Sequence, residues 1–340
     1  MMQSRVSSFF RRNRVDSFII QSSETTGANF AYLSGLELDN SVLLARRDGE
    51  TLLLVNRING EEAKAKSDVD VSVWKNKRDF WNTVLAFTKG CRSIGFDGSF
   101  LTAASYIQLK KRMKGKSLTD ISKELSTQRG VKNSREISIM RKSARIARSI
   151  INELAIEVGK SELDIAKELR LLSVEKGVEP SFEPIVLSGK NTAMPHGKPS
   201  KKKLSPGDVT LVDFGVRYNG YCSDISRCFF LGKCPDELKA YQSLKQVLKR
   251  ALGEMREGAR CSDIPKYFDG YLKEAGLEAM IHAPGHGIGL QVHESPHLGK
   301  ASKDIISNGM TLALEPAYYG KYGVRYEDDI VVVGGRLRIL

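Results

Sequence analysis

The sequence predicts an α+β protein of two domains, an α/β domain over residues 1–122 and an α+β domain over residues 123–340. The chain has 340 residues, more than one domain usually holds. Its first third alternates short β-branched runs with helical patterns, whereas the rest interleaves long amphipathic helices with hairpins. Hydrophobic residues make up 41% and charged residues 27%, so each domain can bury a sizeable core.

In the first domain, apolar runs predict strands and helical spacing predicts helices. The expected strands cover residues 15–20, 41–45, 51–55, 69–74 and 94–96, and a turn at 46–50 joins the second to the third. The expected helices cover the first residues, 61–66, 80–88 and 102–113. No cluster of His, Asp or Glu lies in this third, so we expect the chemistry elsewhere.

Four helices are expected in the second domain. Asn133 with Glu136 three residues later forms a capping-box pattern, and the apolar face of this helix continues towards Gly159. A second helix is expected from Ser161 to Gly177. The remaining two are expected over residues 236–255 and 262–276.

A hairpin is predicted around Asn219-Gly220, the favoured pair for a two-residue type I′ turn. With that loop, Asp213 faces Ser226, and Asp224 lies on the same face, diagonally about 7–8 Å from Asp213 at the backbone. Two carboxylates on an apolar hairpin repel each other and lose hydration unless a cation lies between them. A divalent metal would meet that need. Alternatively, one aspartate faces solvent or a bulge shifts the register.

Histidines are concentrated in one short segment. Four of the five lie within residues 282–297, and glycines flank His286 there. His293-Glu294-Ser295-Pro296-His297 matches the H-E-x-x-H pattern of zinc peptidases. That pattern needs a helix, which Pro296 would disrupt, so we expect this match to be accidental.

Two carboxylates follow apolar runs near the end of the chain. Residues 310–316 end in Glu315-Pro316, and residues 322–333 are expected to form one strand on which Arg325 and Glu327 share a face. Either glutamate alone is commonly a solvent-exposed charge at a strand end. With the residues above they complete a set of two aspartates, a histidine and two glutamates.

In this order and spacing, the set resembles the signature of the pita-bread metallopeptidases, which comprise Xaa-Pro dipeptidases (prolidases), Xaa-Pro aminopeptidases and methionine aminopeptidases. The resemblance covers essentially the whole chain. Residues 29–35, Asn-Phe-Ala-Tyr-Leu-Ser-Gly, resemble a segment of the creatinase-type N-terminal domain, which simple methionine aminopeptidases lack. The chain is most similar to short prokaryotic prolidases, which implies a creatinase-like α/β domain followed by a pita-bread α+β catalytic domain.

The resemblance implies a dinuclear metal site. Its ligands would be Asp213, Asp224, His286, Glu315 and Glu327. An oxygen-rich set favours Mn²⁺ or Co²⁺, and Fe or Zn is possible. By analogy Asp224 and Glu327 bridge the two ions, and a hydroxide between the ions attacks the scissile carbonyl.

The resemblance also implies roles for residues around the metals. His293 would hydrogen-bond to the tetrahedral intermediate, and His196 would transfer a proton or position the substrate. His282 would contact the leaving-group side. Glu315 would also shuttle a proton from the attacking water to the leaving nitrogen. Arg325 would orient ligands or hold a substrate carboxylate.

The expected activity is therefore hydrolysis of Xaa-Pro dipeptides, with an Xaa-Pro aminopeptidase acting on longer peptides as the alternative. A hydrolase of another amide and a non-catalytic binding protein are further alternatives. The net charge is +13, but the basic residues are scattered and form no nucleic-acid-binding motif, so we expect no nucleic-acid partner. Five cysteines without C-x-x-C spacing, no long apolar run and no secretory signal predict a cytoplasmic protein without a membrane span. The family also implies a homodimer.

Overall fold

The computed structural model describes residues 2–340. The chain divides into two compact units, one ending at Arg129 and one running from Gly130 to Leu340. The junction predicted from sequence, between residues 122 and 123, lies at the start of helix α6 (Ser122–Gly130). This helix contacts the first unit, because Leu125 is fully buried and Gln128 Nε2 donates a hydrogen bond to the Arg5 carbonyl at 2.9 Å.

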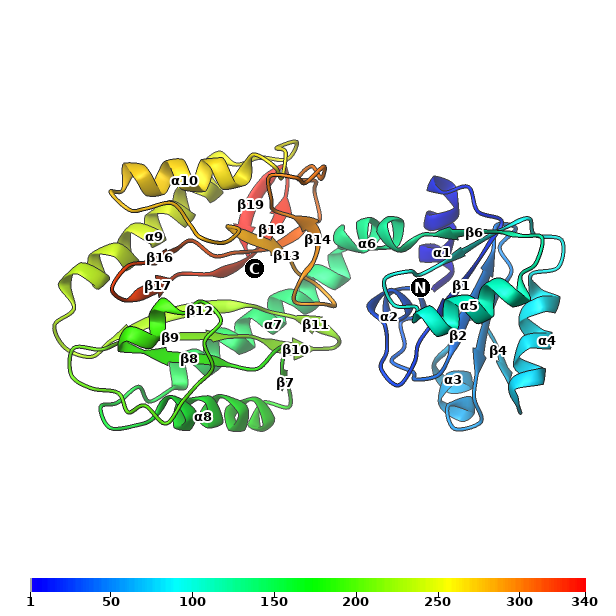
Figure 1. Cartoon of the computed structure of the whole chain (residues 1–340), viewed down its shortest axis with the longest axis horizontal. Helices are drawn as coiled ribbons and strands as arrows, with labels where there is room; N and C mark the ends of the chain where they lie inside the picture. The colour runs from blue at the N-terminus through cyan, green and yellow to red at the C-terminus, as the bar shows by residue number, and fades with distance from the viewer. Residues whose placement is uncertain (1) are drawn as a thin grey trace. The chain divides into compact units, whose positions relative to one another are not determined.

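The first unit is built on a six-stranded sheet in the order β4-β3-β2-β1-β5-β6 (Figure 1). Strand β2 runs antiparallel to both of its neighbours, and the other pairs are parallel. The strands are β1 (Ser17–Gln21), β2 (Val42–Arg46), β3 (Thr51–Val55), β4 (Asp70–Val73), β5 (Ser93–Phe96) and β6 (Ser117–Asp120). The helices are α1 (Met2–Arg12), α2 (Ala28–Ser34), α3 (Gly60–Lys66), α4 (Lys77–Phe87) and α5 (Ala103–Arg112).

Each strand and helix predicted for the first domain is present, but α2, β6 and α6 were not predicted. Helix α2 spans seven residues and buries five of them, so its sequence lacks the polar face of an amphipathic helix. Strand β6 is the opposite case, because it leaves three of its four residues exposed and shows no alternation.

The second unit contains four sheets (Figure 1). Two have three strands, in the orders β11-β10-β7 and β12-β9-β8. A five-stranded sheet has the order β14-β13-β15-β18-β19, and β16 pairs with β17. The strands are β7 (Glu179–Pro180), β8 (Ile185–Ser188), β9 (Val209–Phe214), β10 (Val216–Tyr218), β11 (Tyr221–Cys222), β12 (Ile225–Phe230), β13 (Gly285–Gly287), β14 (Glu294–His297), β15 (Thr311–Leu314), β16 (Ala317–Tyr319), β17 (Gly323–Arg325), β18 (Asp328–Val333) and β19 (Arg336–Ile339).

Two pairs of helices pack against these sheets. Helices α7 (Ser134–Glu153) and α8 (Glu162–Glu175) pack on β9, where Ile151 and Leu169 share a core with Val212. Helices α9 (Pro235–Glu254) and α10 (Ile264–Glu274) pack on the five-stranded sheet. A short 3-10 helix, η1 (Gly189–Ala193), follows β8. Within residues 2–340, no helix is long and apolar enough to cross a bilayer.

The capping box at Asn133 and Glu136 is present, which confirms the predicted start of α7. The predicted end at Gly159 is wrong, because the helix stops at Glu153 and Leu154 adopts an extended conformation. The apolar spacing continued past the helix because Leu154 is itself buried.

The hairpin at Asn219-Gly220 has the predicted register. Tyr218 pairs with Tyr221, and the two turn residues have φ angles of 47° and 81°. Beyond the turn the two arms pass from one three-stranded sheet into the other at Gly215, where a Cβ atom would lie 1.7 Å from the Ser223 carbonyl oxygen. This close approach requires glycine, and it allows the chain to bend beside the two aspartates.

The single strand predicted over residues 322–333 is wrong. The structure divides it into β17 and β18, which belong to different sheets. Tyr326 and Glu327 form the connection between them. Both strands contain β-branched residues and are buried except at Val333, so the strand-like pattern continues across a break that tertiary packing imposes.

Candidate metal centre

The five sequence-predicted ligand residues lie in or directly beside strands of two sheets. Asp213 pairs with Ser226 across the β9/β12 ladder, as predicted, and Asp224 directly precedes β12. The other three belong to the five-stranded sheet: His286 is on β13, Glu315 follows β15, and Glu327 precedes β18. Since β13 pairs with β15 and β15 with β18, three distant parts of the sequence meet at neighbouring positions.

Three of these side chains form one compact group. The ligand atoms of Asp224, His286 and Glu327 lie within 4.8 Å of one another. His286 Nε2 is 3.5 Å from Asp224 Oδ2. This is a spacing at which a single cation could contact all three side chains.

Arg325 connects the remaining carboxylates to this group. Its Nη2 lies 2.6 Å from Asp213 Oδ2, and its Nη1 lies 3.8 Å from Glu315 Oε2. Its Nε donates to Ser226 Oγ at 2.9 Å, and that hydroxyl donates to Glu327 Oε2 at 2.7 Å. The buried guanidinium therefore fixes several acids in place at once.

Burial makes the charged forms of these acids unfavourable. Desolvation, followed by repulsion from neighbouring carboxylates, raises the pKa of Asp224 and of Glu327 well above the usual range. Desolvation also raises the pKa of Glu315 to about 7, although the nearby Arg325 opposes the shift. The cluster therefore favours bound protons or bound cations over bare negative charge.

Two carboxylate oxygens indicate that cations fit here. Asp213 Oδ1 and Asp224 Oδ1 are buried and accept no hydrogen bond from the described residues 2–340. Buried acceptors in proteins are nearly always satisfied, so these two oxygens need a partner. Carboxylate oxygens with one imidazole nitrogen are donors that suit Mn²⁺, Co²⁺ or Fe²⁺.

Burial also lowers the pKa of His282, His286 and His293, which favours their neutral forms. A neutral imidazole can donate a lone pair to a metal or accept a proton. The His293 ring centroid is 4.1 Å from that of His286. His196 is exposed, and it lies close enough that a charge on it would lower the pKa of both His282 and His293.

Tyr319 on β16 is a residue that the sequence analysis missed. Its hydroxyl lies 3.0 Å from His282 Nε2 and 3.3 Å from Arg325 Nη1, so it links two of the predicted residues. Burial raises the pKa of Tyr319 to about 12, which keeps the phenol protonated. No local signal marked it, because β15 and β16 belong to different sheets and the strand alternation does not continue from Glu315 to Tyr319.

Asp329 was also missed. Both of its carboxylate oxygens accept from the backbone N–H of Asp224, at 3.3 and 3.2 Å. It is completely buried, and desolvation raises its pKa well above the ordinary value. Asp329 therefore fixes the backbone of the segment that carries Asp224.

The H-E-x-x-H match does not form a helix, in agreement with the prediction. Residues 294–297 form strand β14. Glu294 is buried and bonded to Lys132 Nζ at 2.7 Å, whereas His297 is exposed. The segment thus lacks the one-turn spacing of its two histidines that the zinc motif requires.

Two family models match the chain, and together they cover most of it. Residues 3–131 match the creatinase/prolidase N-terminal domain. Residues 138–333 match metallopeptidase family M24. This pair confirms the predicted order of a creatinase-like domain followed by a pita-bread catalytic domain.

Similar proteins extend over nearly the full length. An Xaa-Pro dipeptidase of Pyrococcus horikoshii is 29% identical over 336 residues, which is 96% of this chain and 93% of that protein. A solved Xaa-Pro dipeptidase from Bacillus anthracis is 27% identical, with a TM-score of 0.89, and covers 99% of this chain and 96% of its own. A solved X-Pro aminopeptidase from Thermotoga maritima is also 27% identical with a TM-score of 0.89, covering 98% and 97%.

The family match includes all five predicted ligand positions and more than half of the chain. M24 enzymes are metallopeptidases, which agrees with a carboxylate cluster that requires cations. The chain belongs to metallopeptidase family M24.

Proposed function

We propose that this chain is a metal-dependent Xaa-Pro dipeptidase. The observation that carries the proposal is the group of Asp224, His286 and Glu327, with Asp213 and Glu315 beside it on Arg325. Two buried oxygens of the aspartates have no hydrogen-bond partner among residues 2–340. The full-length similarity to proteins named Xaa-Pro dipeptidase supports this substrate class.

We assign five residues to two divalent ions, with Mn²⁺ or Co²⁺ preferred and Fe or Zn possible. They are Asp213, Asp224, His286, Glu315 and Glu327. When bound, such ions polarise the scissile carbonyl and lower the pKa of a water molecule, which makes a nucleophile available near neutral pH.

The protein side chains supply orientation and proton transfer. Arg325 holds Asp213 and, through Ser226, Glu327, so that the acids keep their positions while charge develops. Glu315 receives the proton of the attacking water and passes it to the leaving proline nitrogen. Its Oε2 lies 3.9 Å from His282 Nδ1, a proximity that supports a role for His282 near that proton.

Of the four histidines outside the ligand set, His196, His282 and His293 contact the substrate. His293 lies against His286 and donates a hydrogen bond to the oxygen that becomes negatively charged. His196, which is exposed, positions the substrate or transfers a proton at the rim. His282 is held by Tyr319 at 3.0 Å on the leaving-group side.

An Xaa-Pro aminopeptidase is the second candidate, and the similarity to the Thermotoga maritima structure supports it. We further propose a cytoplasmic homodimer, with no nucleic-acid partner. A hydrolase of another amide would share this centre, whereas a non-catalytic binding protein would have no need for a complete set of ligand residues.

Chelator-treated protein, with and without added Mn²⁺ or Co²⁺, tests the proposal on Met-Pro, Met-Ala and a longer Xaa-Pro peptide. Metal-restored cleavage of Met-Pro alone is the expected result. Cleavage of the longer peptide instead would identify an aminopeptidase. Two bound metals without cleavage of any peptide would contradict both assignments.

A further inference from the structure

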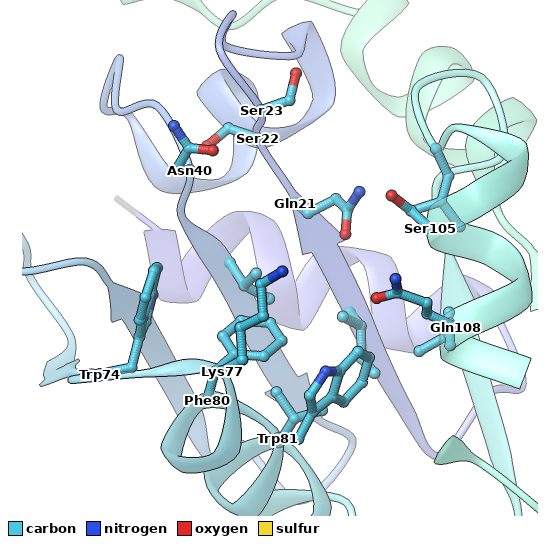
Figure 2. A pocket seen from close by; sticks show the side chains of 15 residues that line it. Gln21, Ser22, Ser23, Asn40, Trp74, Lys77, Phe80, Trp81, Ser105 and Gln108 are labelled. Carbon is cyan, nitrogen blue, oxygen red and sulfur yellow. The ribbon is translucent and has the colours of Figure 1, made fainter. Parts of the chain in front are cut away.

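A cavity lies within the first unit, and the proposed peptidase reaction does not account for it. Its volume is about 280 Å³, and it opens where the loops that follow β1, β4 and β5 come together (Figure 2). All of its lining residues belong to the first unit. It is therefore a separate feature from the carboxylate cluster.

The topology of the sheet favours a cavity at this place. From β1 the chain passes outward through β2, β3 and β4 on one side, and then returns through α4 to β5 on the other side of β1. The connections after β1 and β5 thus diverge, which leaves a crevice at the carboxyl ends of these strands. In open α/β sheets, ligands bind at such a switch point.

Aromatic side chains form one wall of the cavity. Phe80 and Trp81 on α4 meet edge to face with centroids 5.1 Å apart, and Phe80 meets Trp74 in the same way at 6.1 Å. The buried side chains of Val84 and Leu109 complete an apolar floor. Flat walls of this kind suit a planar ring, which buries large areas at little entropic cost.

One ammonium group and several uncharged polar groups also line the cavity. Figure 2 shows the ammonium group of Lys77 pointing toward Gln21, with Gln108 beyond it on the side of α5. Among the described residues 2–340, no carboxylate lines the cavity. The electrostatics therefore favour an anion.

We propose that this pocket binds a small planar aromatic molecule that carries a carboxylate. The ring stacks against Trp81 and Phe80, and the carboxylate pairs with Lys77 and accepts from the amides of Gln21 and Gln108. The volume lies at the lower end of known ligand pockets, which limits the ligand to one or two rings. This assignment is independent of the peptidase activity.

Tryptophan fluorescence provides a direct test, because the chain has two tryptophans and both line the cavity. The full chain is titrated with benzoate, with benzamide as the uncharged analogue and cyclohexanecarboxylate as the non-planar one. Saturable quenching by benzoate, with binding at least about tenfold weaker for either analogue, is expected. Linear, unsaturable quenching by benzoate, or equal quenching by benzamide, would overturn the proposal.

Two variants and one control locate the site. Lys77→Met is expected to weaken benzoate binding about tenfold, because it removes the charge-assisted hydrogen bond. Ser105→Phe, which fills the cavity from α5, is expected to abolish saturable binding. Lys89→Met lies just beyond the other end of α4 and does not line the pocket, so binding should be unchanged. Unaltered benzoate affinity in Lys77→Met and Ser105→Phe would contradict the assignment.

Discussion

Asp97 in the first unit and Asp224 in the second are both buried carboxylates, with 4% and 5% of their surfaces exposed. Asp97 accepts hydrogen bonds from Asn29 Nδ2 at 2.8 Å and from Ser99 Oγ at 2.5 Å. Asn29 in turn accepts from Arg129 at 2.9 Å, so the charge of Asp97 is linked to a cation. Asp224 instead lies among other acids, and its Oδ1 has no hydrogen-bond partner among residues 2–340.

This difference teaches that burial of an acid does not by itself indicate a functional site. A buried carboxylate with a structural role accepts hydrogen bonds from donors of the protein and needs no bound cation. Asp213 and Asp224 in the second unit each have one buried oxygen without a donor among residues 2–340, and a cation would fill that deficit. The four predictions below test that distinction, beginning with the largest expected effect.

Asp224→Asn should decrease Met-Pro hydrolysis by at least about a thousandfold, because loss of a direct ligand exceeds the 10–100-fold typical of outer contacts. Metal content, measured by mass spectrometry, should fall with the rate. Asp97→Asn is the matched control in the first unit. It should lower the melting temperature but leave turnover and metal content unchanged. An Asp224→Asn protein with full metal content and rate would refute the assignment.

Arg325→Lys should lower kcat about 10–100-fold, the usual cost of disturbing a contact that orients a metal ligand. Lysine cannot bond Asp213 and Ser226 simultaneously as the guanidinium does. Arg47→Lys is the comparison, since Arg47 bonds the Phe10 carbonyl at 2.8 Å in the first unit. Thermal melting should show reduced stability in both variants. Steady-state kinetics should show a kcat defect in Arg325→Lys alone. Equal kcat values for the Arg325→Lys and Arg47→Lys variants would show that Arg325 does not contribute to the reaction.

Tyr319→Phe should reduce kcat/KM about three- to tenfold, which corresponds to one neutral hydrogen bond. The hydroxyl contacts to His282 and Arg325 are lost, whereas the ring remains. Tyr318→Phe, at the neighbouring position on β16, provides the control. Identical kinetics for the two variants would mean that the link between His282 and Arg325 has no influence on the reaction.

Metal-free protein should become less stable as pH rises from 6.5 to about 8. Glu315 binds its proton with a pKa of about 7 in the folded state, against 4.5 unfolded, so its contribution to stability is present at low pH and lost as pH rises through 7. The histidines have lowered folded pKa values, so their opposite contribution levels off as pH rises above their unfolded value of 6.5. Asp224 and Glu327 reinforce the fall, because their pKa values are also raised in the folded state.

The expected fall in melting temperature over this interval is about 2–4 °C, measured by calorimetry after chelation. Saturating Mn²⁺ should abolish the fall, because the cations replace the protons as partners of the acids. A pH dependence that is unchanged by Mn²⁺ would show that these carboxylates do not bind the metal.

Much of the fold could be predicted because its signals are local. The capping box at Asn133 and the Asn219-Gly220 turn depend on a few adjacent residues, and both are present in the structure. The break at Tyr326 could not be predicted, because the strands β17 and β18 are separated by their different partner strands, which only the tertiary structure reveals. Helix α2 was missed since its burial on nearly all sides leaves no periodic pattern.

The site followed the same division. The order and spacing of the five candidate ligands from Asp213 to Glu327 can be read from the sequence. The resemblance to a known family implied the roles of these residues. Tyr319 and Asp329 were missed because their partners, His282 and the backbone of Asp224, lie far away in the chain. No local pattern records which acid will accept which donor after folding.

The spacing of the candidate ligands along the chain has a consequence for protein synthesis. Asp213 and Asp224 leave the ribosome on one hairpin, whereas Glu327 follows only when most of the five-stranded sheet has been made. A nascent chain that ends before β18 therefore carries an incomplete set. On this arrangement a growing chain gains the last candidate ligand only with Glu327, so the proposed metal centre cannot assemble before that residue has been synthesised.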